Sequence, residues 1–152
     1  MRTPSKIAAD FMAIDAHDDT IEAINVIPAF GRISCKIELT LYRHWENKRR
    51  LLQFVGCTNV SVTADTKVLL DNAPNNTCGL EATASIEDIM KIMRSHKKAW
   101  NVTYDKTIDP LPTKLSSASN YVLFRVRLFG GILEVVAKSF KITSPAALRG
   151  TR

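Results

Sequence analysis

The sequence has little of what most metal, redox and disulfide-bonded proteins use. Its three cysteines, Cys35, Cys57 and Cys78, are an odd set, and no two of them have the CxxC spacing of zinc or redox sites. An odd count also disfavours a disulfide framework, which small secreted proteins depend on. We therefore expect reduced, mostly buried thiols in a cytoplasmic protein that carries no cofactor.

Long hydrophobic runs are missing as well. No stretch of about 18 apolar residues is present, so the sequence predicts no membrane-spanning helix. The opening residues, MRTPSKIAADF, carry positive charge but lack the apolar stretch of a signal peptide, because Asp10 interrupts it. Glycine and proline are scarce, at six each, which disfavours a disordered or fibrous chain. The length and the 45% hydrophobic content predict a single folded domain over residues 1–152.

What the sequence does contain is the pattern of β-strands. From Ile33 to Leu41, apolar residues alternate with polar ones, as in a strand with one buried face. The β-branched segment 20–27, the apolar segment 51–55 and the segment 60–62 predict neighbouring strands. A sheet with one solvent-exposed face is typical of an antiparallel meander rather than of a parallel βαβ arrangement.

The clearest hairpin signal is YVLFRVRLFGGILEVVAKSFKI, residues 121–142. The dipeptide Gly130-Gly131 predicts a two-residue turn, because glycine adopts positive φ values at little cost. In that register Arg127 faces Glu134 on one side of the hairpin, while apolar pairs occupy the other side. The C-terminal strands are therefore expected to pair around this turn.

Two helices are predicted beside the strands. Residues 5–14 carry apolar side chains at helical spacing after a Thr-Pro-Ser start. Ser85, followed by Asp88 near the capping-box position, precedes an amphipathic segment that predicts a helix over residues 85–98. Residues 106–119, rich in proline and serine, are predicted to form a flexible loop. The expected fold class is α+β, a predominantly antiparallel sheet with one amphipathic helix packed on it.

One short motif invites a chemical interpretation. In IDAHDD, residues 14–19, an imidazole lies among three carboxylates, and both groups are suitable ligands for zinc, manganese or iron. A metal site needs three or four converging ligands, and His44 and His96 lie at spacings that predict no convergence. We therefore predict no metal site; if a metal is bound, His17 and Asp18 are the candidate ligands. The other interpretation is a polar turn whose aspartates accept backbone N–H groups where the sheet begins.

Motifs of familiar enzymes are absent from the sequence. No GxSxG elbow is present, and the cysteines lie in or beside apolar runs, where inert thiols are expected. The Gly130-Gly131 pair lacks the following helix and lysine of a phosphate-binding loop. The sequence predicts no catalytic residue and favours a protein that is not an enzyme.

Positive charge gathers toward the C-terminus. Residues 91–152 hold twelve basic and three acidic residues, within a net charge of +6. Basic side chains interleaved with aromatic ones on an exposed sheet can bind an acidic partner or a nucleic acid backbone. The candidate binding residues lie at one hairpin end and on the last hairpin: Tyr42, Trp45, Arg49, Arg50, Arg125 and Arg127.

Four segments together resemble a known class of proteins. The order HDDTIEAINV, ISCKIELTLY, RRLLQFVGCTNV and YVLFRVRLFGGILEVVAKSFKI resembles small β-rich bacterial proteins of unknown function, which begin a sheet with a His-Asp pair and close with a glycine-turned hairpin. Some of these families accompany polymorphic toxins and are regarded as immunity proteins. The resemblance implies a non-catalytic binding protein, although the basic charge departs from the acidic charge usual in immunity proteins.

Three functions are compatible with these features. We favour a small cytoplasmic protein-interaction domain of the immunity-like kind, acting through exposed aromatic and arginine anchors. The alternative is a nucleic-acid or other anion-binding module, whose affinity would fall steeply with salt. The third is a metal-dependent hydrolase centred on His17. The sequence identifies neither the partner nor the oligomeric state.

Overall fold

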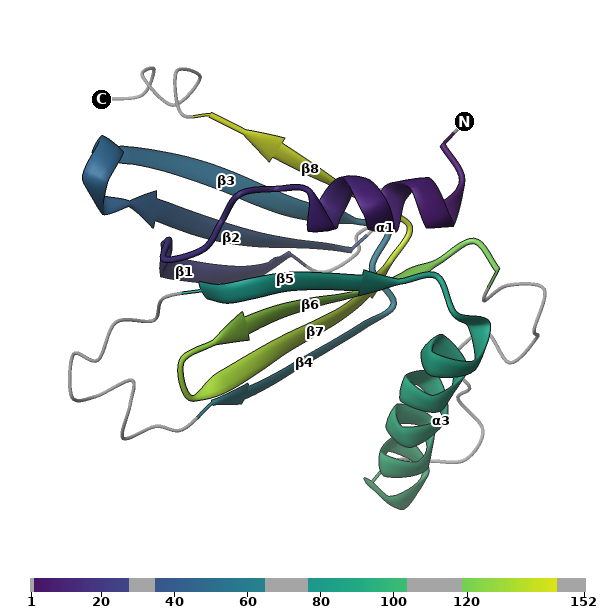
Figure 1. Cartoon of the computed structure of the whole chain (residues 1–152). Coiled ribbons are helices and arrows are strands. Elements are labelled where there is room, and N and C mark those ends of the chain that lie inside the picture. The colour runs from purple at the N-terminus through teal and green to yellow at the C-terminus, as the bar shows by residue number, and fades with distance from the viewer. Residues whose placement is uncertain (1, 28–34, 65–76, 104–118, 145–152) are drawn as a thin grey trace.

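The protein folds as two antiparallel sheets with helices packed on them, in agreement with the predicted α+β class (Figure 1). The computed structural model describes residues 2–27, 35–64, 77–103 and 119–144. In chain order the elements are α1 (Pro4–Met12), β1 (Thr20–Ile27), β2 (Lys36–Arg43), the 3₁₀ turn η1 (His44–Glu46), β3 (Lys48–Val55), β4 (Asn59–Ala64), β5 (Thr77–Thr83), α3 (Ile86–Thr103), β6 (Val122–Leu128), β7 (Gly131–Ala137) and β8 (Ser139–Thr143).

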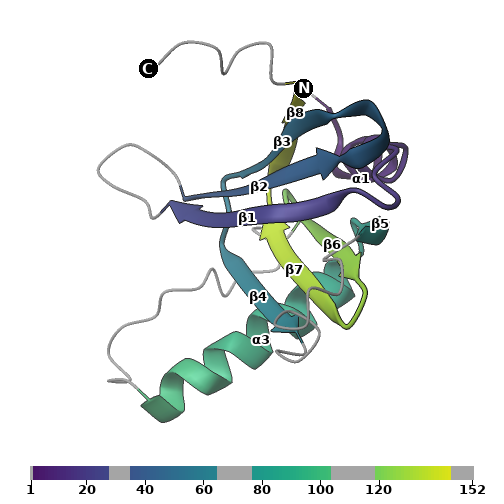
Figure 2. The same ribbon diagram turned by 90° about the vertical axis from the view of Figure 1, so that its left-hand side faces the viewer.

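Among the described strands, the chain crosses twice from one sheet to the other. The first sheet has the order β1-β2-β3-β8 and the second has the order β4-β7-β6-β5. The β3–β4 and β7–β8 crossings lie side by side, because Lys138 N–H donates to the Val55 carbonyl at 3.1 Å and Thr58 N–H to the Val136 carbonyl at 2.9 Å. Strands that bend between two sheets form the corners of steeply crossed packings. Figure 2 shows the strands of the two sheets crossing in this way.

Four phenylalanines join α1 to both sheets. Phe11 of α1 packs against Phe124 of β6 with ring centroids 4.9 Å apart, and against Phe140 of β8 at 5.2 Å. Phe54 of β3 lies 5.8 Å from Phe11 and 5.2 Å from Phe124. Tilted and edge-to-face rings at these distances add about 0.5–1.5 kcal/mol per pair to the free energy gained by burial. The inner faces of both sheets therefore share a hydrophobic core, which α1 covers along one side.

The predicted strands of the first sheet are present, but β2 runs from Lys36 to Arg43 instead of from Ile33 to Leu41, and residues 33–34 lie outside the described residues. The inward residues Ile37, Leu39 and Leu41 of β2 are completely buried, as their alternation with polar residues predicted. Strand β1 has the predicted bounds, whereas β3 begins at Lys48, three residues before the predicted start. The added residues pair with the end of β2. Their charged side chains lack the apolar alternation that predicts a strand, so this extension could not be predicted from the sequence.

Both predicted helices are present with shifted ends. Helix α1 begins after Thr3, whose Oγ1 accepts the Lys6 N–H at 3.3 Å, and it ends at Met12 rather than at residue 14. Ser85 Oγ accepts the Asp88 N–H at 3.3 Å, as expected of the predicted cap, and α3 continues to Thr103, past the predicted end. Neither described helix is long and apolar enough to cross a lipid bilayer.

Helix α3 packs on the outer face of the second sheet. Its buried residues Ile89, Met90 and Met93 contact Leu123 of β6 and Val136 of β7. Leu123 and Val136 point to the face opposite the phenylalanine core, because neighbouring residues of a strand point to opposite faces of the sheet. The second sheet is consequently covered on both faces over part of its length.

The register of the last hairpin differs from the predicted one. The turn residues are Phe129 and Gly130, with φ of +80° at Gly130, and Gly131 is already the first residue of β7. Consequently Arg125, not Arg127, faces Glu134. The shift equals two residues, so every side chain keeps its predicted face, and alternation alone could not distinguish the two registers.

Two strands escaped prediction. Strand β5 contains Gly79 and a register shift next to Thr77, which remove the alternating signal. Strand β8 seemed from the sequence to continue the last hairpin, but the chain turns at Lys138 and β8 pairs with β3. Residues 106–118 of the predicted loop 106–119 lie outside the described residues.

Candidate functional site

The last aspartate of IDAHDD lies buried between two arginines. Asp19 is completely inaccessible to solvent, and its Oδ1 accepts a hydrogen bond from Arg43 Nε at 2.9 Å. Its Oδ2 accepts a hydrogen bond from Arg50 Nη2. The hydrogen bond that Arg43 donates to Asp19 is the largest of the effects that raise the pKa of Arg43 above its usual value. A buried carboxylate requires such partners, because an unpaired buried charge is strongly destabilising.

The rest of the motif forms hydrogen bonds with both sheets. The Asp15 carbonyl accepts hydrogen bonds from both Arg43 and Arg50. Asp18 N–H donates to the carbonyl of Thr77 in β5 at 2.9 Å, and Thr77 N–H donates to the Asp19 carbonyl at 2.9 Å. The Thr77 hydroxyl donates to the Ala16 carbonyl. These contacts make IDAHDD a polar turn at the start of β1. The aspartate side chains, however, pair with arginine and histidine side chains rather than with the backbone N–H groups that we predicted.

The histidines of the metal hypothesis are engaged separately. His17 is exposed, and its Nδ1 lies 2.7 Å from Asp18 Oδ2. His44 Nε2 lies 2.7 Å from Thr20 Oγ1 instead. The side chain of His96 lies outside the described residues. Among the side chains that are described, no three histidine, cysteine, aspartate or glutamate residues could together hold a metal ion.

Three predicted binding residues, Tyr42, Trp45 and Arg49, lie at the β2–β3 turn, residues 42–49, which we call the hairpin tip. Asn47 adopts φ of +50°, a left-handed conformation that asparagine tolerates better than most residues. Its N–H donates to the His44 carbonyl at 3.2 Å, and its Oδ1 accepts the Tyr42 hydroxyl at 2.8 Å. These bonds fix the conformation of a turn that apolar burial alone would leave undetermined.

Trp45 projects from the hairpin tip with 59% of its surface exposed. The guanidinium carbon of Arg43 lies 5.1 Å from the centroid of the indole ring. Arg43 is itself held by Asp19 and by Glu46 Oε1, which accepts from its Nη1 at 3.1 Å. The exposed indole of Trp45 thus contacts the Arg43 guanidinium, which hydrogen bonds to Asp19 and Glu46 hold in place.

Tyr42 and Arg49 form the neighbouring part of the tip. The Arg49 guanidinium lies 4.9 Å over the Tyr42 ring and donates two hydrogen bonds to Glu22 of β1, at 2.8 and 2.9 Å. The hydrogen bond from Arg49 lowers the pKa of Glu22, and the same bond raises the pKa of Arg49. Arg50, by contrast, points inward to Asp19 with only 18% of its side chain exposed, so it is not the exposed anchor that we predicted.

The remaining predicted residues, Arg125 and Arg127, lie in the second sheet and do not join the hairpin tip. Arg125 Nε donates to Glu134 Oε2 at 2.8 Å, and Arg127 donates to Glu81 of β5. The hydrogen bond from Arg127 lowers the pKa of Glu81. All four arginines proposed as binding residues are therefore paired with carboxylates, which reduces the positive field that they present to solvent.

The ion pair between Arg43 and Asp19 was not predicted, although the sequence contains a pattern that indicates a buried Arg43. The alternation of Ile37, Leu39 and Leu41 continues to Arg43, which places an arginine on the buried face of β2. A buried arginine implies a carboxylate nearby. The pairing of Thr20 with Tyr42 brings Asp19 to that position, but this pairing cannot be read from the sequence.

A scan against protein-family models and searches of curated proteins and of solved structures found no match. The resemblance to toxin-immunity proteins stays a prediction.

Proposed function

We propose that this protein is a non-catalytic protein-interaction domain that binds its partner through the hairpin tip. The observation that carries the proposal is the exposure of Trp45 on a turn whose backbone and supporting side chains are fixed by hydrogen bonds. A few residues supply most of the affinity at protein interfaces, and tryptophan, tyrosine and arginine are enriched among them. All three residue types occur together in the hairpin tip.

The support beneath Trp45 favours binding energetically. Ordering a side chain at an interface costs about 0.5–1.5 kcal/mol when it is free to rotate. Here Arg43 lies against one face of the indole, and the ion pairs with Asp19 and Glu46 hold Arg43. Part of that ordering cost is paid during folding, so burial of the indole contributes more fully to affinity.

The chemistry of the tip fits a protein partner better than a nucleic acid. Arg49 is paired with Glu22, and Lys48 Nζ lies 3.1 Å from Glu46 Oε2, so these cations of the hairpin tip are paired with carboxylates. Such a surface matches an apolar pocket with a mixed polar rim. We expect the partner in the cytoplasm, and a polymorphic toxin is the partner class that the sequence resemblance implies.

The experiment that tests the proposal compares two aromatic residues with matched exposure. Phe129, in the β6–β7 turn, is 58% exposed, close to the value of Trp45. Immobilised wild type, Trp45→Ala and Phe129→Ala are each offered the purified products of neighbouring genes. A product retained by wild type and Phe129→Ala but lost by Trp45→Ala supports the proposal. Equal retention by all three proteins, or retention by none, contradicts it.

A further inference from the structure

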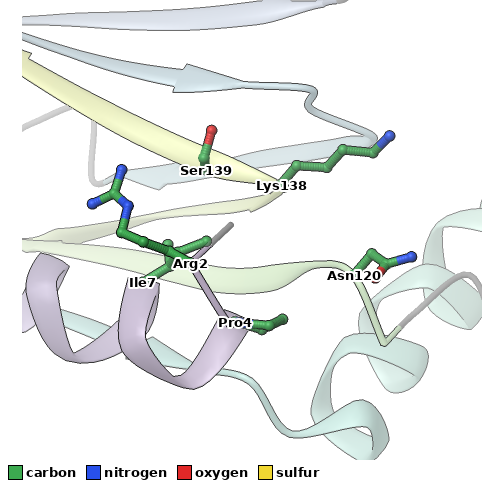
Figure 3. Close-up of a pocket in the computed structure, with 6 residues that line it drawn as sticks. All are labelled: Arg2, Pro4, Ile7, Asn120, Lys138 and Ser139. Atoms are coloured by element: carbon green, nitrogen blue, oxygen red, sulfur yellow. The ribbon is translucent and has the colours of Figure 1, made fainter.

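A pocket of about 440 Å³ opens at the N-terminal end of α1, beside the β7–β8 crossing (Figure 3). Its two cationic side chains do not converge, because the Arg2 guanidinium and the Lys138 ammonium group point away from each other. Arg2 Nη1 is paired with Asp10 Oδ2 at 3.3 Å, and Lys138 Nζ lies 5.7 Å from the centroid of the Tyr121 ring. The described lining therefore directs no pair of charges at a ligand. Uncovered apolar surface is found instead at the edge of the first sheet.

The second half of β1 carries apolar side chains that the fold leaves uncovered. Ile24, Val26 and Ile27 are 37%, 54% and 37% exposed. Ile24 pairs with Leu39 and Val26 pairs with Ile37, and both partners are completely buried. Because paired residues share a face of the sheet, Ile24 and Val26 point to the core-facing side. Figure 2 shows the end of β1 projecting beyond the strands of the second sheet, which explains their exposure.

The backbone along this half of β1 is open to another strand. β1 is an edge strand and pairs with β2. Its start is closed by Thr77, whose N–H donates to the Asp19 carbonyl at 2.9 Å, and a register shift follows between Ile21 and Ala23. Within the described part of the chain, no other strand pairs with segment 23–27 on its open side. The N–H and C=O groups of such an edge are a template for a further strand.

The open segment, Ala23 to Ile27, is complementary to itself. Its sequence AINVI contains no charged residue, although charged side chains commonly protect sheet edges. In an antiparallel pair with Asn25 opposite Asn25 of a second copy, Ile24 faces Val26 and Ala23 faces Ile27. Each apolar side chain then meets an apolar one, and no like charges oppose each other. A centre at Ile24 would instead place Val26 opposite Glu22, so the sequence favours the register centred on Asn25.

We propose that two copies of this protein pair antiparallel through residues 23–27 of β1, which joins their first sheets into one continuous sheet. Strand addition at an open edge is a common mode of protein association. Both copies use the same surface, so the contact closes into a symmetric dimer and does not extend into a fibre. Ile24 and Val26 of each copy come together on the core-facing side. The hairpin tip adjoins the start of β1 and stays outside the contact.

Two valines of matched exposure separate this contact from general stickiness of sheet edges. Val62, on the edge strand β4, is 50% exposed and pairs with the completely buried Leu133. Sedimentation velocity of the whole chain compares wild type, Val26→Lys and Val62→Lys. Wild type is expected to dimerise with a Kd on the order of 10–100 µM, because the contact is smaller than a standard interface. Val26→Lys should weaken dimerisation at least about tenfold, and Val62→Lys should change it less than about twofold.

Two results of this comparison overturn the proposal. One is a wild type that stays monomeric up to about 500 µM, the result expected where a strand of a different protein occupies the edge. The other is an equal effect of the two lysine substitutions. Amide spectra recorded on each variant establish that it is folded.

Opposite charges at Asn25 test the register. Asn25→Asp and Asn25→Lys each place like charges directly opposite each other in the dimer, so each variant alone is expected to dimerise at least about tenfold more weakly than wild type. An equimolar mixture pairs the two opposite charges and should recover association close to that of wild type. No recovery in the mixture overturns the proposal. Trp45→Ala is expected to dimerise like wild type, which keeps this test independent of the hairpin tip.

Discussion

Asp19 Oδ1 accepts a hydrogen bond from Arg43 Nε at 2.9 Å, and neither side chain has more than a tenth of its surface exposed. This ion pair connects the start of β1 to the end of β2, directly below the exposed indole of Trp45. The motif that most resembled a metal or catalytic site thus supports the hairpin tip. Its contribution to the proposed function is structural, through the position of Arg43.

Asp19→Asn is predicted to destabilise the fold strongly. The substitution keeps the shape of the side chain but leaves Arg43 and Arg50 without their shared carboxylate, at a cost of about 3–5 kcal/mol. The measurement is the free energy of unfolding in urea. Asp18→Asn is the control: its side chain is half-exposed, and asparagine tolerates the φ of +64° found there. A change below about 1 kcal/mol is expected for the control, and similar losses in both variants would disprove the role of Asp19.

Acid is predicted to destabilise the protein through its surface glutamates. Arg49 lowers the pKa of Glu22, and Arg127 lowers the pKa of Glu81, so the unfolded chain binds protons more readily than the folded chain. Their stabilisation is complete above about pH 4.3, the usual pKa of glutamate, and is lost as pH falls through the lowered values. Partial exposure and salt keep the effect small. Urea unfolding across this range should show a weaker dependence on pH in Glu81→Gln; an unchanged dependence would refute the assignment.

Cys57 is predicted to be an unreactive thiol. Burial, followed by the neighbouring Cys35, raises its pKa to about 12, and its Sγ lies 3.3 Å from the Phe54 carbonyl oxygen. Because the thiolate is the reactive species, alkylation at about pH 8 should be on the order of 10³ slower than that of an unperturbed thiol. The measurement uses iodoacetamide on a variant with Cys35→Ser and Cys78→Ser, folded and in urea. Equal rates in both conditions would be the contrary result.

The sequence predicted those parts of the fold that depend on local patterns. Alternating burial located β2, and the Ser85 cap located the start of α3. It failed where long-range pairing decides the outcome. Each side chain of the last hairpin lies on the same face in the predicted and in the observed register, so burial could not distinguish the two registers. The alternation of β5 around Gly79 is too weak to be recognised.

The candidate site was predictable in composition but not in arrangement. Trp45, Tyr42 and Arg49 belong to one turn, so their proximity follows from the sequence alone. The inward orientation of Arg50 depends on Asp19, which lies 31 residues earlier in the chain. The pairing of Arg127 with Glu81 depends on a strand that the sequence did not reveal. Charge density in the sequence therefore overstated the free positive charge on the surface.

Trp45 is proposed as the main anchor for a protein partner. Calorimetric titration of the partner into wild type, Trp45→Ala and Phe129→Ala tests this role, after thermal unfolding has shown that all three are folded. Loss of the indole is predicted to cost at least about 2 kcal/mol of binding free energy, roughly thirtyfold in Kd. Phe129→Ala should change the binding free energy by less than about 0.5 kcal/mol. A Trp45→Ala protein that binds the partner with wild-type affinity would contradict the claim.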